Sequence, residues 1–376
     1  MHLIKSVLAA ITVAILVALN PAAASATTVV VATVTTGSSP FDSDVSPDGT
    51  KVYVTNYNAA TVSVIDAETN AVIRTYTDSN IIAPRGITVD NSGRYVYVAN
   101  DQAFGDAGEG GLAVIDTVSN TVSAIHFGDI EVPYELVLSP DGSKLYASRY
   151  AARDIKVIST ASKSVTATIS LTASVGNSIY DLDISSDGSE LWISGTSEAF
   201  VVSTATNSQT HRIALPETTF GVAVSGDKVV FVYPNIDTIT IVDRATHSIS
   251  RTISPAAAAG AWGVTATPDG SLIYVINSGL NRVVEFDAST MSQTASINVG
   301  ASPWYASVSP NSATLYVANT GADTITVLST GLNTDPAPEL ANTGQEFPGN
   351  LFLSSIVLVS LGLVAFSLRR VKFSSK

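Results

Sequence analysis

A short unit recurs seven times along this 376-residue chain, and this recurrence constrains the fold more than any other feature. Each copy has a tight turn, then a run of β-forming residues with an aromatic side chain at a fixed position. The copies are 39 to 49 residues apart. The turns are Pro47-Asp48-Gly49, Asn91-Ser92-Gly93, Pro140-Asp141-Gly142, Ser186-Asp187-Gly188, Ser225-Gly226-Asp227, Pro268-Asp269-Gly270 and Pro310-Asn311-Ser312. A chain of this length would ordinarily be expected to form two or three domains, but a repeat with this period indicates a single repeat architecture instead.

Apolar and polar residues alternate with period two inside each copy, which indicates β-strands. In the first copy, strands are predicted at 53–56, 61–66 and 71–74, after a first strand that precedes the turn. Four strands in about 40 to 45 residues is the signature of a β-propeller blade. The sequence therefore predicts an all-β, seven-bladed β-propeller over residues 27–330, with four antiparallel strands per blade.

The seventh copy stops after its third strand, which is predicted at 324–328. The missing fourth strand is assigned to 29–35, because this stretch resembles other fourth strands such as 294–299. We therefore expect the N-terminal strand to close the ring. Such closure removes exposed strand edges, which would otherwise favour aggregation.

The run Tyr53-Val54-Thr55-Asn56 and its repeats, among them Tyr97-Val98-Ala99-Asn100 and Tyr316-Val317-Ala318-Asn319, resemble the YVTN family of seven-bladed β-propellers. The resemblance covers about residues 29–330. It is specific for the fold and uninformative for function, because that family and its relatives include surface-layer repeats, lactonase-like enzymes and domains of redox enzymes.

Residues 1–26 have the features of a secretory signal peptide. Lys5 supplies the positive charge, residues 6–19 form an apolar run, and Ala24-Ser25-Ala26 matches a small-x-small cleavage site. The apolar run is short for a membrane span, so cleavage is favoured over an uncleaved anchor helix.

The C-terminal region contains three elements in order, after a linker at 331–339. A pentapeptide comes first, residues 351–368 are apolar and long enough for one transmembrane helix, and a basic tail follows. The pentapeptide is Leu340, Ala341, Asn342, Thr343 and Gly344, and the tail carries Arg369, Arg370 and Lys372.

This order resembles the LPXTG-type sorting signal of Gram-positive surface proteins, with Ala341 in place of the usual Pro. The resemblance implies that residues 340–376 are a signal which sortase cleaves between Thr343 and Gly344, joining the protein to cell-wall peptidoglycan. The expected location is the cell surface, with a single membrane pass before processing. A simple single-pass anchor is the alternative interpretation.

Composition excludes several classes of function. The absence of Cys excludes a disulfide scaffold, a thiolate metal site and a cysteine nucleophile. The formal net charge of −13 disfavours nucleic acid and anionic membrane surfaces and suits solubility outside the cell. His126 and His211 fall in predicted fourth strands and His247 in the turn before one, away from the channel, so neither a His-built metal site nor a Ser-His-Asp triad is expected. No cofactor is predicted.

One aligned position, where each first strand enters the channel, is aromatic in six copies and Arg in the other. It lies six residues before the turn, or five in the copy that is one residue shorter. The seven residues are Phe41, Arg85, Tyr134, Tyr180, Phe220, Trp262 and Trp304. The next residue inward is acidic in three copies, at Asp42, Glu135 and Asp181. These ten residues are predicted to form a binding site at the channel mouth. The alternative is that the rings simply pack between blades.

Two functions follow from this pattern. The first is a wall-anchored binding, adhesion or scaffold module whose channel mouth takes a glycan, a peptide or a host protein. The second is a surface hydrolase of the lactonase-like class that uses the channel carboxylates, since carboxylate pairs alone perform acid–base chemistry. No spacing in the sequence fixes a set of catalytic residues, so the binding module is favoured.

Overall fold

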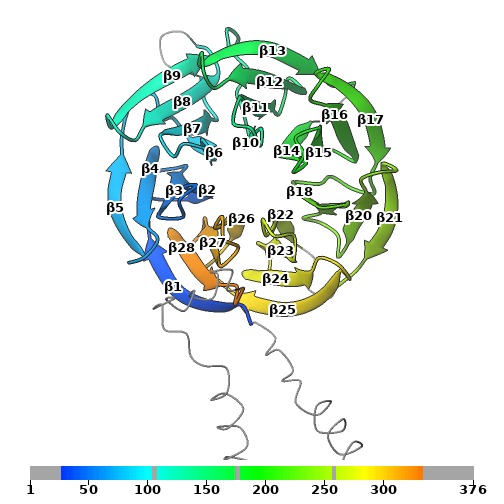
Figure 1. Ribbon diagram of the computed structural model, residues 1–376. Coiled ribbons are helices and arrows are strands. Elements are labelled where there is room, and N and C mark those ends of the chain that lie inside the picture. The colour runs from blue at the N-terminus through cyan, green and yellow to red at the C-terminus, as the bar shows by residue number, and fades with distance from the viewer. Residues whose placement is uncertain (1–26, 104–107, 173, 175–177, 256–259, 333–376) are drawn as a thin grey trace, which may run out of the picture. The chain divides into compact units, whose positions relative to one another are not determined.

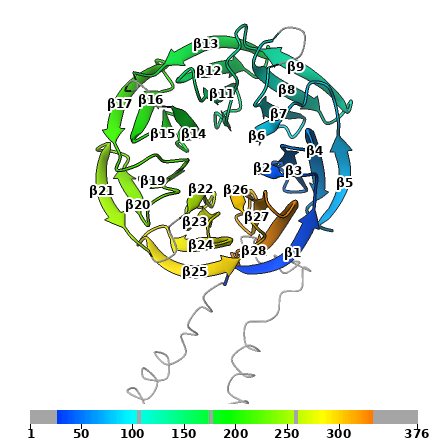
Figure 2. The same cartoon turned by 180° about the vertical axis from the view of Figure 1, so that it is seen from behind.

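The computed structural model describes residues 27–332, apart from 104–107, 173, 175–177 and 256–259. Within these residues, strands β1 to β28 form seven antiparallel sheets of four strands each. The sheets surround a central channel as the blades of a propeller (Figure 1), which Figure 2 shows from behind. The predicted all-β, seven-bladed architecture is confirmed.

The two inner strands of each blade carry the repeat motif. The first strands are β2 (Pro40–Val45), β6 (Pro84–Val89), β10 (Leu136–Leu138), β14 (Ile179–Ile184), β18 (Gly221–Ser225), β22 (Ala261–Ala266) and β26 (Pro303–Val308). The second strands are β3 (Lys51–Asn56), β7 (Tyr95–Asn100), β11 (Lys144–Arg149), β15 (Glu190–Gly195), β19 (Lys228–Val232), β23 (Leu272–Asn277) and β27 (Thr314–Asn319).

The two outer strands complete each blade. The third strands are β4 (Thr61–Asp66), β8 (Gly111–Asp116), β12 (Asp154–Ser159), β16 (Glu198–Ser203), β20 (Ile239–Asp243), β24 (Arg282–Asp287) and β28 (Thr324–Ser329). The fourth strands are β5 (Ala71–Tyr76), β9 (Thr121–His126), β13 (Ser164–Ser170), β17 (Ser208–Ala214), β21 (Ser248–Ile253), β25 (Ser292–Asn298) and β1 (Val29–Thr35).

The N-terminal strand closes the ring, as the sequence predicts. The last blade has the order β1-β28-β27-β26, and β1 is antiparallel to β28 from Val29 opposite Ser329 to Thr35 opposite Thr324. Thr28, just before β1, is buried, and its hydroxyl lies 3.1 Å from Tyr274 Oη in the preceding blade. The two ends of the propeller are therefore held in one sheet.

The turn between the first two strands is built by an aspartate. Ser46 Oγ donates to Asp48 Oδ1 at 2.6 Å, and the Thr50 N–H donates to the same oxygen at 3.0 Å. Gly49 follows with φ of +71°, a conformation that favours glycine. These bonds, with that from Ser46 the largest cause, lower the pKa of Asp48 to about 2.

The Asn that ends the repeat motif has a structural function. Asn56 is fully buried, and its Nδ2 donates to Thr61 Oγ1 at 3.0 Å and to Ser63 Oγ at 2.9 Å. It therefore fixes the turn from β3 to β4. Asn319 makes the equivalent bonds in the last blade.

The hydrophobic core lies between blades. Seven clusters of buried apolar side chains each join two neighbouring blades, one cluster for each interface of the ring. The cluster between blades 4 and 5, for example, contains Trp192, Phe231 and Tyr233. Because all of these clusters lie between residues 34 and 328, the propeller carries its own core.

Several predicted segments lie outside the described residues: the signal peptide, most of the linker, the sorting signal, the transmembrane helix at 351–368 and the basic tail. In the part that the structure describes, there is no helix of the length and apolarity needed to cross a membrane.

Candidate binding site

The seven residues predicted at the channel mouth form one continuous circuit of contacts. Neighbouring ring centroids lie 4.2 Å apart for Tyr180 and Phe220 and 6.1 Å apart for Tyr134 and Tyr180. The guanidinium of Arg85 completes the circuit. The structure therefore brings Phe41, Arg85, Tyr134, Tyr180, Phe220, Trp262 and Trp304 together, and we call this set the aromatic collar.

Exposure divides the collar into two parts. Phe41, Tyr134 and Tyr180 are buried, at 2 to 8% exposure. Phe220, Trp262 and Trp304, which come from three successive blades, are partly exposed. The indole rings of Trp262 and Trp304 are stacked, with centroids 4.8 Å apart and planes 11° apart. The exposed part of the collar is thus a contiguous aromatic surface over blades 5 to 7.

Arg85 is held in the collar by its neighbours. Its guanidinium carbon lies 4.4 Å from the centre of the Tyr134 ring and 5.2 Å from that of Phe41. Its Nη2 lies 2.7 Å from Asp101 Oδ2, which also accepts a 2.8 Å hydrogen bond from Tyr57 Oη. A cation in contact with aromatic faces and paired with a carboxylate is fixed in position.

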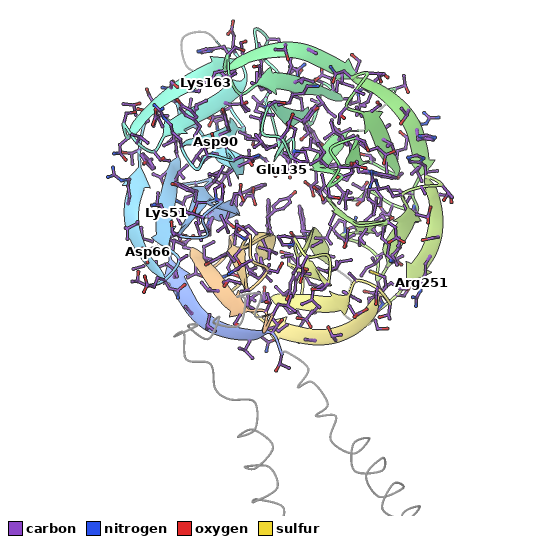
Figure 3. The ribbon with its side chains drawn as sticks, viewed as in Figure 1. Lys51, Asp66, Asp90, Glu135, Lys163 and Arg251 are labelled. Carbon is purple, nitrogen blue, oxygen red and sulfur yellow. The ribbon has the colours of Figure 1, made fainter. Side chains whose placement is uncertain are left out.

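The three predicted carboxylates lie beneath the collar, inside the channel. Asp42, Glu135 and Asp181 are all less than 9% exposed and line a cavity of about 290 Å³. The lining continues to Val308 and Pro268, at the turn end of the first strands, and contains no collar residue among those that the structure describes. Figure 3 shows Glu135 at the channel. The collar and the carboxylates are therefore adjacent layers.

The channel aspartates connect first strands of neighbouring blades. These strands belong to different sheets, so their N–H groups have no ladder partner across the blade interface. Asp42 Oδ2 accepts the Ile87 N–H at 3.1 Å, and Asp181 Oδ2 accepts the Val222 N–H at 3.0 Å. Two residues on, Asp44 and Asp183 repeat the arrangement with Val89 and Val224.

Burial raises the pKa of every carboxyl group in the channel. The pKa of Asp42 rises to about 7, and those of Asp44 and Asp183 rise to about 6. Burial also raises the pKa of Glu135 and of Asp181 well above the usual range, and the neighbouring charge of Asp42 adds to the shift at Glu135. The channel therefore retains protons near neutral pH.

Glu135 differs from the aspartates in its hydrogen bonding. Its Oε1 accepts the Leu136 N–H at 3.2 Å, whereas Oε2 is buried without a hydrogen-bond partner. The side chain has room only because Gly86 in the preceding blade has no Cβ. The structure thus contains one incompletely satisfied carboxylate at the centre of the acidic layer.

Metal-ligating groups do not assemble in the described part of the chain. No set of three or more His, Asp or Glu side chains there is arranged to hold an ion. His126 lies in β9 and His211 in β17, while His247 lies in the turn before β21 and stacks on His211 at 3.9 Å.

Five residues of the site lie outside the ten predicted ones, although Tyr305 occupies the aligned position of Asp42. Asp44 and Asp183 follow Asp42 and Asp181 at the period-two spacing that puts them on the same strand face, so the Asp-x-Asp pairs are a usable signal. Tyr305 lines the channel, and its ring centroid lies 5.4 Å from that of Phe41. Tyr57 and Tyr150 extend the collar from loops after the second strands.

Comparison with known proteins agrees with the fold. No protein-family model matches this chain. A stretch of 119 residues is 37% identical to the seven-bladed beta-propeller protein Rv1057 of Mycobacterium tuberculosis (strain ATCC 25618 / H37Rv), which is 31% of this chain and 28% of that protein. The match therefore spans much less than two thirds of that relative.

Two solved structures are similar in fold. Hydrazine synthase of Kuenenia stuttgartiensis matches with a TM-score of 0.67 and 19% identity over 78% of this chain and 96% of that chain. The Cps50 (Swd1) beta-propeller domain of Myceliophteria thermophila matches with a TM-score of 0.66 and 12% identity over 80% and 99%. Likeness at this identity shows the propeller fold and nothing of the ligand.

Proposed function

We propose that this chain is a cell-surface binding module that takes a glycan on the exposed part of the aromatic collar. The observation that carries the proposal is the surface formed by Phe220, Trp262 and Trp304. Flat aromatic faces bind the apolar faces of sugar rings, and a rigid scaffold presents them at little cost in entropy. A propeller holds this surface on the ends of three packed strands.

Tryptophan fluorescence tests this function directly. Titrating residues 27–337 with cell-wall glycan fragments should give a saturable change, because Trp262 and Trp304 are partly exposed in the collar. Trp192 is fully buried beside His247 and should not respond. Trp262→Ala and Trp304→Ala should each abolish the change while preserving the thermal unfolding midpoint within a few degrees. A response that survives both substitutions would contradict the proposal.

We further propose that the module is attached to peptidoglycan through Thr343. The pentapeptide, the apolar segment and the basic tail occur in the order that sortase substrates require. In this arrangement the propeller lies close to the wall, because only a short linker separates it from the pentapeptide. A ligand that is itself part of the wall, or attached to it, fits such a position.

The attachment is tested by fractionating cells that express the wild type and Thr343→Ala. The wild type should remain with the wall after detergent extraction and be released by a peptidoglycan hydrolase. Thr343→Ala should move to the detergent-soluble fraction, because sortase should no longer cleave the altered pentapeptide and the apolar segment should stay attached to the protein. Release of both forms by detergent alone would exclude covalent attachment and favour a single-pass anchor.

A surface hydrolase is the second candidate, and one observation favours it. Carboxyl groups with raised pKa values in a cavity are a recognised feature of active sites. Asp42 and Asp181 are, however, already bonded to backbone N–H groups of the next blade, and the collar lies across their end of the channel. The binding module therefore accounts for more of the geometry.

A further inference from the structure

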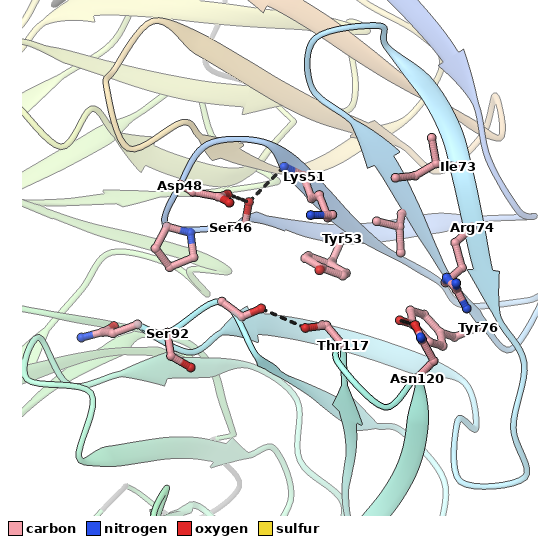
Figure 4. Close-up of a pocket in the computed structure, with 14 residues that line it drawn as sticks. Ser46, Asp48, Lys51, Tyr53, Ile73, Arg74, Tyr76, Ser92, Thr117 and Asn120 are labelled. Carbon is pink, nitrogen blue, oxygen red and sulfur yellow. Dashed lines mark hydrogen bonds between the residues drawn. The ribbon is translucent and has the colours of Figure 1, made fainter.

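A cleft between blades 1 and 2 is larger than the channel and lies outside the site described above. Its volume is about 650 Å³. One wall is formed by Lys51, Tyr53 and Arg74 from blade 1, and the other includes Thr117 and Asn120 from blade 2. Figure 4 shows these side chains on the two sides of the cleft.

The cleft is lined by two cationic side chains, Lys51 and Arg74, and by one carboxylate, that of Asp48. Neither Lys51 nor Arg74 forms an ion pair in the part of the chain that the structure describes. Lys51 lies near enough to Asp48 and Asp66 to help lower their pKa values, and Oδ1 of each aspartate accepts hydrogen bonds within its own turn. Arg74 lies over the Tyr76 ring at 5.6 Å.

In the equivalent cleft between blades 4 and 5, the basic side chains are paired with carboxylates. Arg244 crosses that cleft, with its Nη2 2.6 Å from Asp187 and its Nε 3.0 Å from Glu190. His247 Nε2 lies 2.7 Å from the other oxygen of Glu190. Arg244 and His247 of blade 5 thus each contact a carboxylate of blade 4.

Blades 1 and 2 keep the turn aspartate, with Asp48 at the position of Asp187, but have different residues at the other positions. Lys51 begins β3 as Glu190 begins β15, and Thr117 and Asn120 occupy the turn positions of Arg244 and His247. The facing side chains are therefore short and neutral. Asn120 Oδ1 already accepts a 3.0 Å hydrogen bond from Tyr76 Oη, so its amide offers only donors to the cleft.

We propose that the blade 1–2 cleft binds a small anionic ligand through a carboxylate or phosphate group. Lys51, Arg74 and the Asn120 amide supply donors, as guanidinium and ammonium groups do in charge-assisted bonds to such groups. The exposed side chain of Ile73 and the ring of Tyr53 offer apolar contact to the ligand body. The external anion takes the part that Glu190 takes between blades 4 and 5, while Asp48 keeps the position of Asp187. The proposal is independent of the collar.

The test is an NMR titration of isotope-labelled residues 27–337 with inorganic phosphate and, separately, with citrate. Sodium chloride at matched ionic strength serves as the salt control. Saturable shifts are expected at the backbone amides of Thr117 and Asn120 with at least one of the two anions. The anion that binds more tightly identifies whether phosphate or carboxylate is preferred.

Substitutions make the test specific. Lys51→Ala and Arg74→Ala should each raise the Kd about tenfold, because each removes a charge-assisted hydrogen bond. Lys51→Arg should retain binding. Lys144 begins β11 in blade 3 as Lys51 begins β3, and its Nζ donates to the Thr204 carbonyl oxygen at 3.4 Å. Lys144→Ala is therefore the matched control and should leave the Kd unchanged.

Three results would overturn the proposal. They are the absence of saturable shifts with both anions, equal shifts with chloride, and equal weakening by Lys51→Ala and Lys144→Ala. None of them bears on glycan binding at the collar, because Trp262→Ala should bind the anion as the wild type does.

Discussion

Deletion of residues 27–36 is expected to abolish cooperative unfolding of the propeller. The deletion removes β1, so that β28 becomes an exposed edge and the last blade keeps only three strands. It also removes Val34, which is buried in the cluster that joins blades 7 and 1. The loss is comparable with the whole stability of a domain, about 5–15 kcal/mol. Differential scanning calorimetry should show no sharp transition.

A matched pair of point substitutions distinguishes the loss of ring closure by β1 from the mere effect of shortening the chain. Val34→Asp buries a charge at a position that is 6% exposed and should cost about 3 kcal/mol or more. Val31→Asp, in the same strand but 54% exposed, should change stability by about 0.5 kcal/mol or less. A deletion variant that unfolds in one sharp transition at the wild-type temperature would refute closure by β1.

The free energy of unfolding is expected to fall as the pH rises from about 4 to about 7. Burial raises the pKa of Asp42 to about 7 and those of Asp44 and Asp183 to about 6, so the folded state holds protons that the unfolded chain releases near pH 4. A carboxyl group whose pKa is higher by one in the folded state than in the unfolded chain loses about 1.4 kcal/mol of stabilisation across this range. Chemical denaturation at several pH values measures this loss.

The turn aspartates determine how the free energy of unfolding changes at acidic pH. The pKa values of Asp48 and Asp141 are lowered to about 2, chiefly by hydrogen bonds from Ser46 and Ser139. Their contribution is present above pH 4 and is lost as the pH falls through 2. Maximum stability should therefore lie between about pH 4 and 5.

Glu135→Gln measures how much the channel carboxylates contribute to the pH dependence of stability, separately from the other titrating groups. Gln keeps the oxygen that accepts the Leu136 N–H and removes the charge beside Asp42. The variant should be about 1–3 kcal/mol more stable than the wild type at pH 8 and equal to it near pH 4.5. Glu68→Gln, at an exposed site, is the control and should match the wild type at both pH values. Equal or lower stability of Glu135→Gln at pH 8 would contradict the electrostatic account.

The repeat period predicts the blades because each blade is a local unit with its own turn. An aromatic residue recurs at the position of Tyr53 in six blades, whereas the strand register places Val230 there in blade 5. The same alignment leads to Phe41, Trp304 and the rest of the collar. Alignment gives the phase of a residue but not the radius of the ring that the blades form. That radius decides whether neighbouring collar rings touch, and whether Asp42 and Glu135 share one layer.

Features that break the repeat are harder to predict from it. Tyr57 and Tyr150 share one aligned position, directly after the repeat motif, but the other copies have no aromatic residue there, so the position does not stand out in the alignment. The blade 1–2 cleft also depends on differences between the copies. Its charge arises because Lys51, Thr117 and Asn120 stand where blades 4 and 5 have Glu190, Arg244 and His247. An alignment that searches for what the copies share passes over such differences.

Closure of the ring also determines how the propeller bears a mechanical load. The chain leaves the last blade from β28, which is hydrogen-bonded to β27 on one side and to β1 on the other. A force applied through the C-terminal end therefore meets two ladders at once, and cannot peel an edge strand bond by bond. Tension between a wall attachment and a ligand on the collar would be shared by the first and last strands of the propeller.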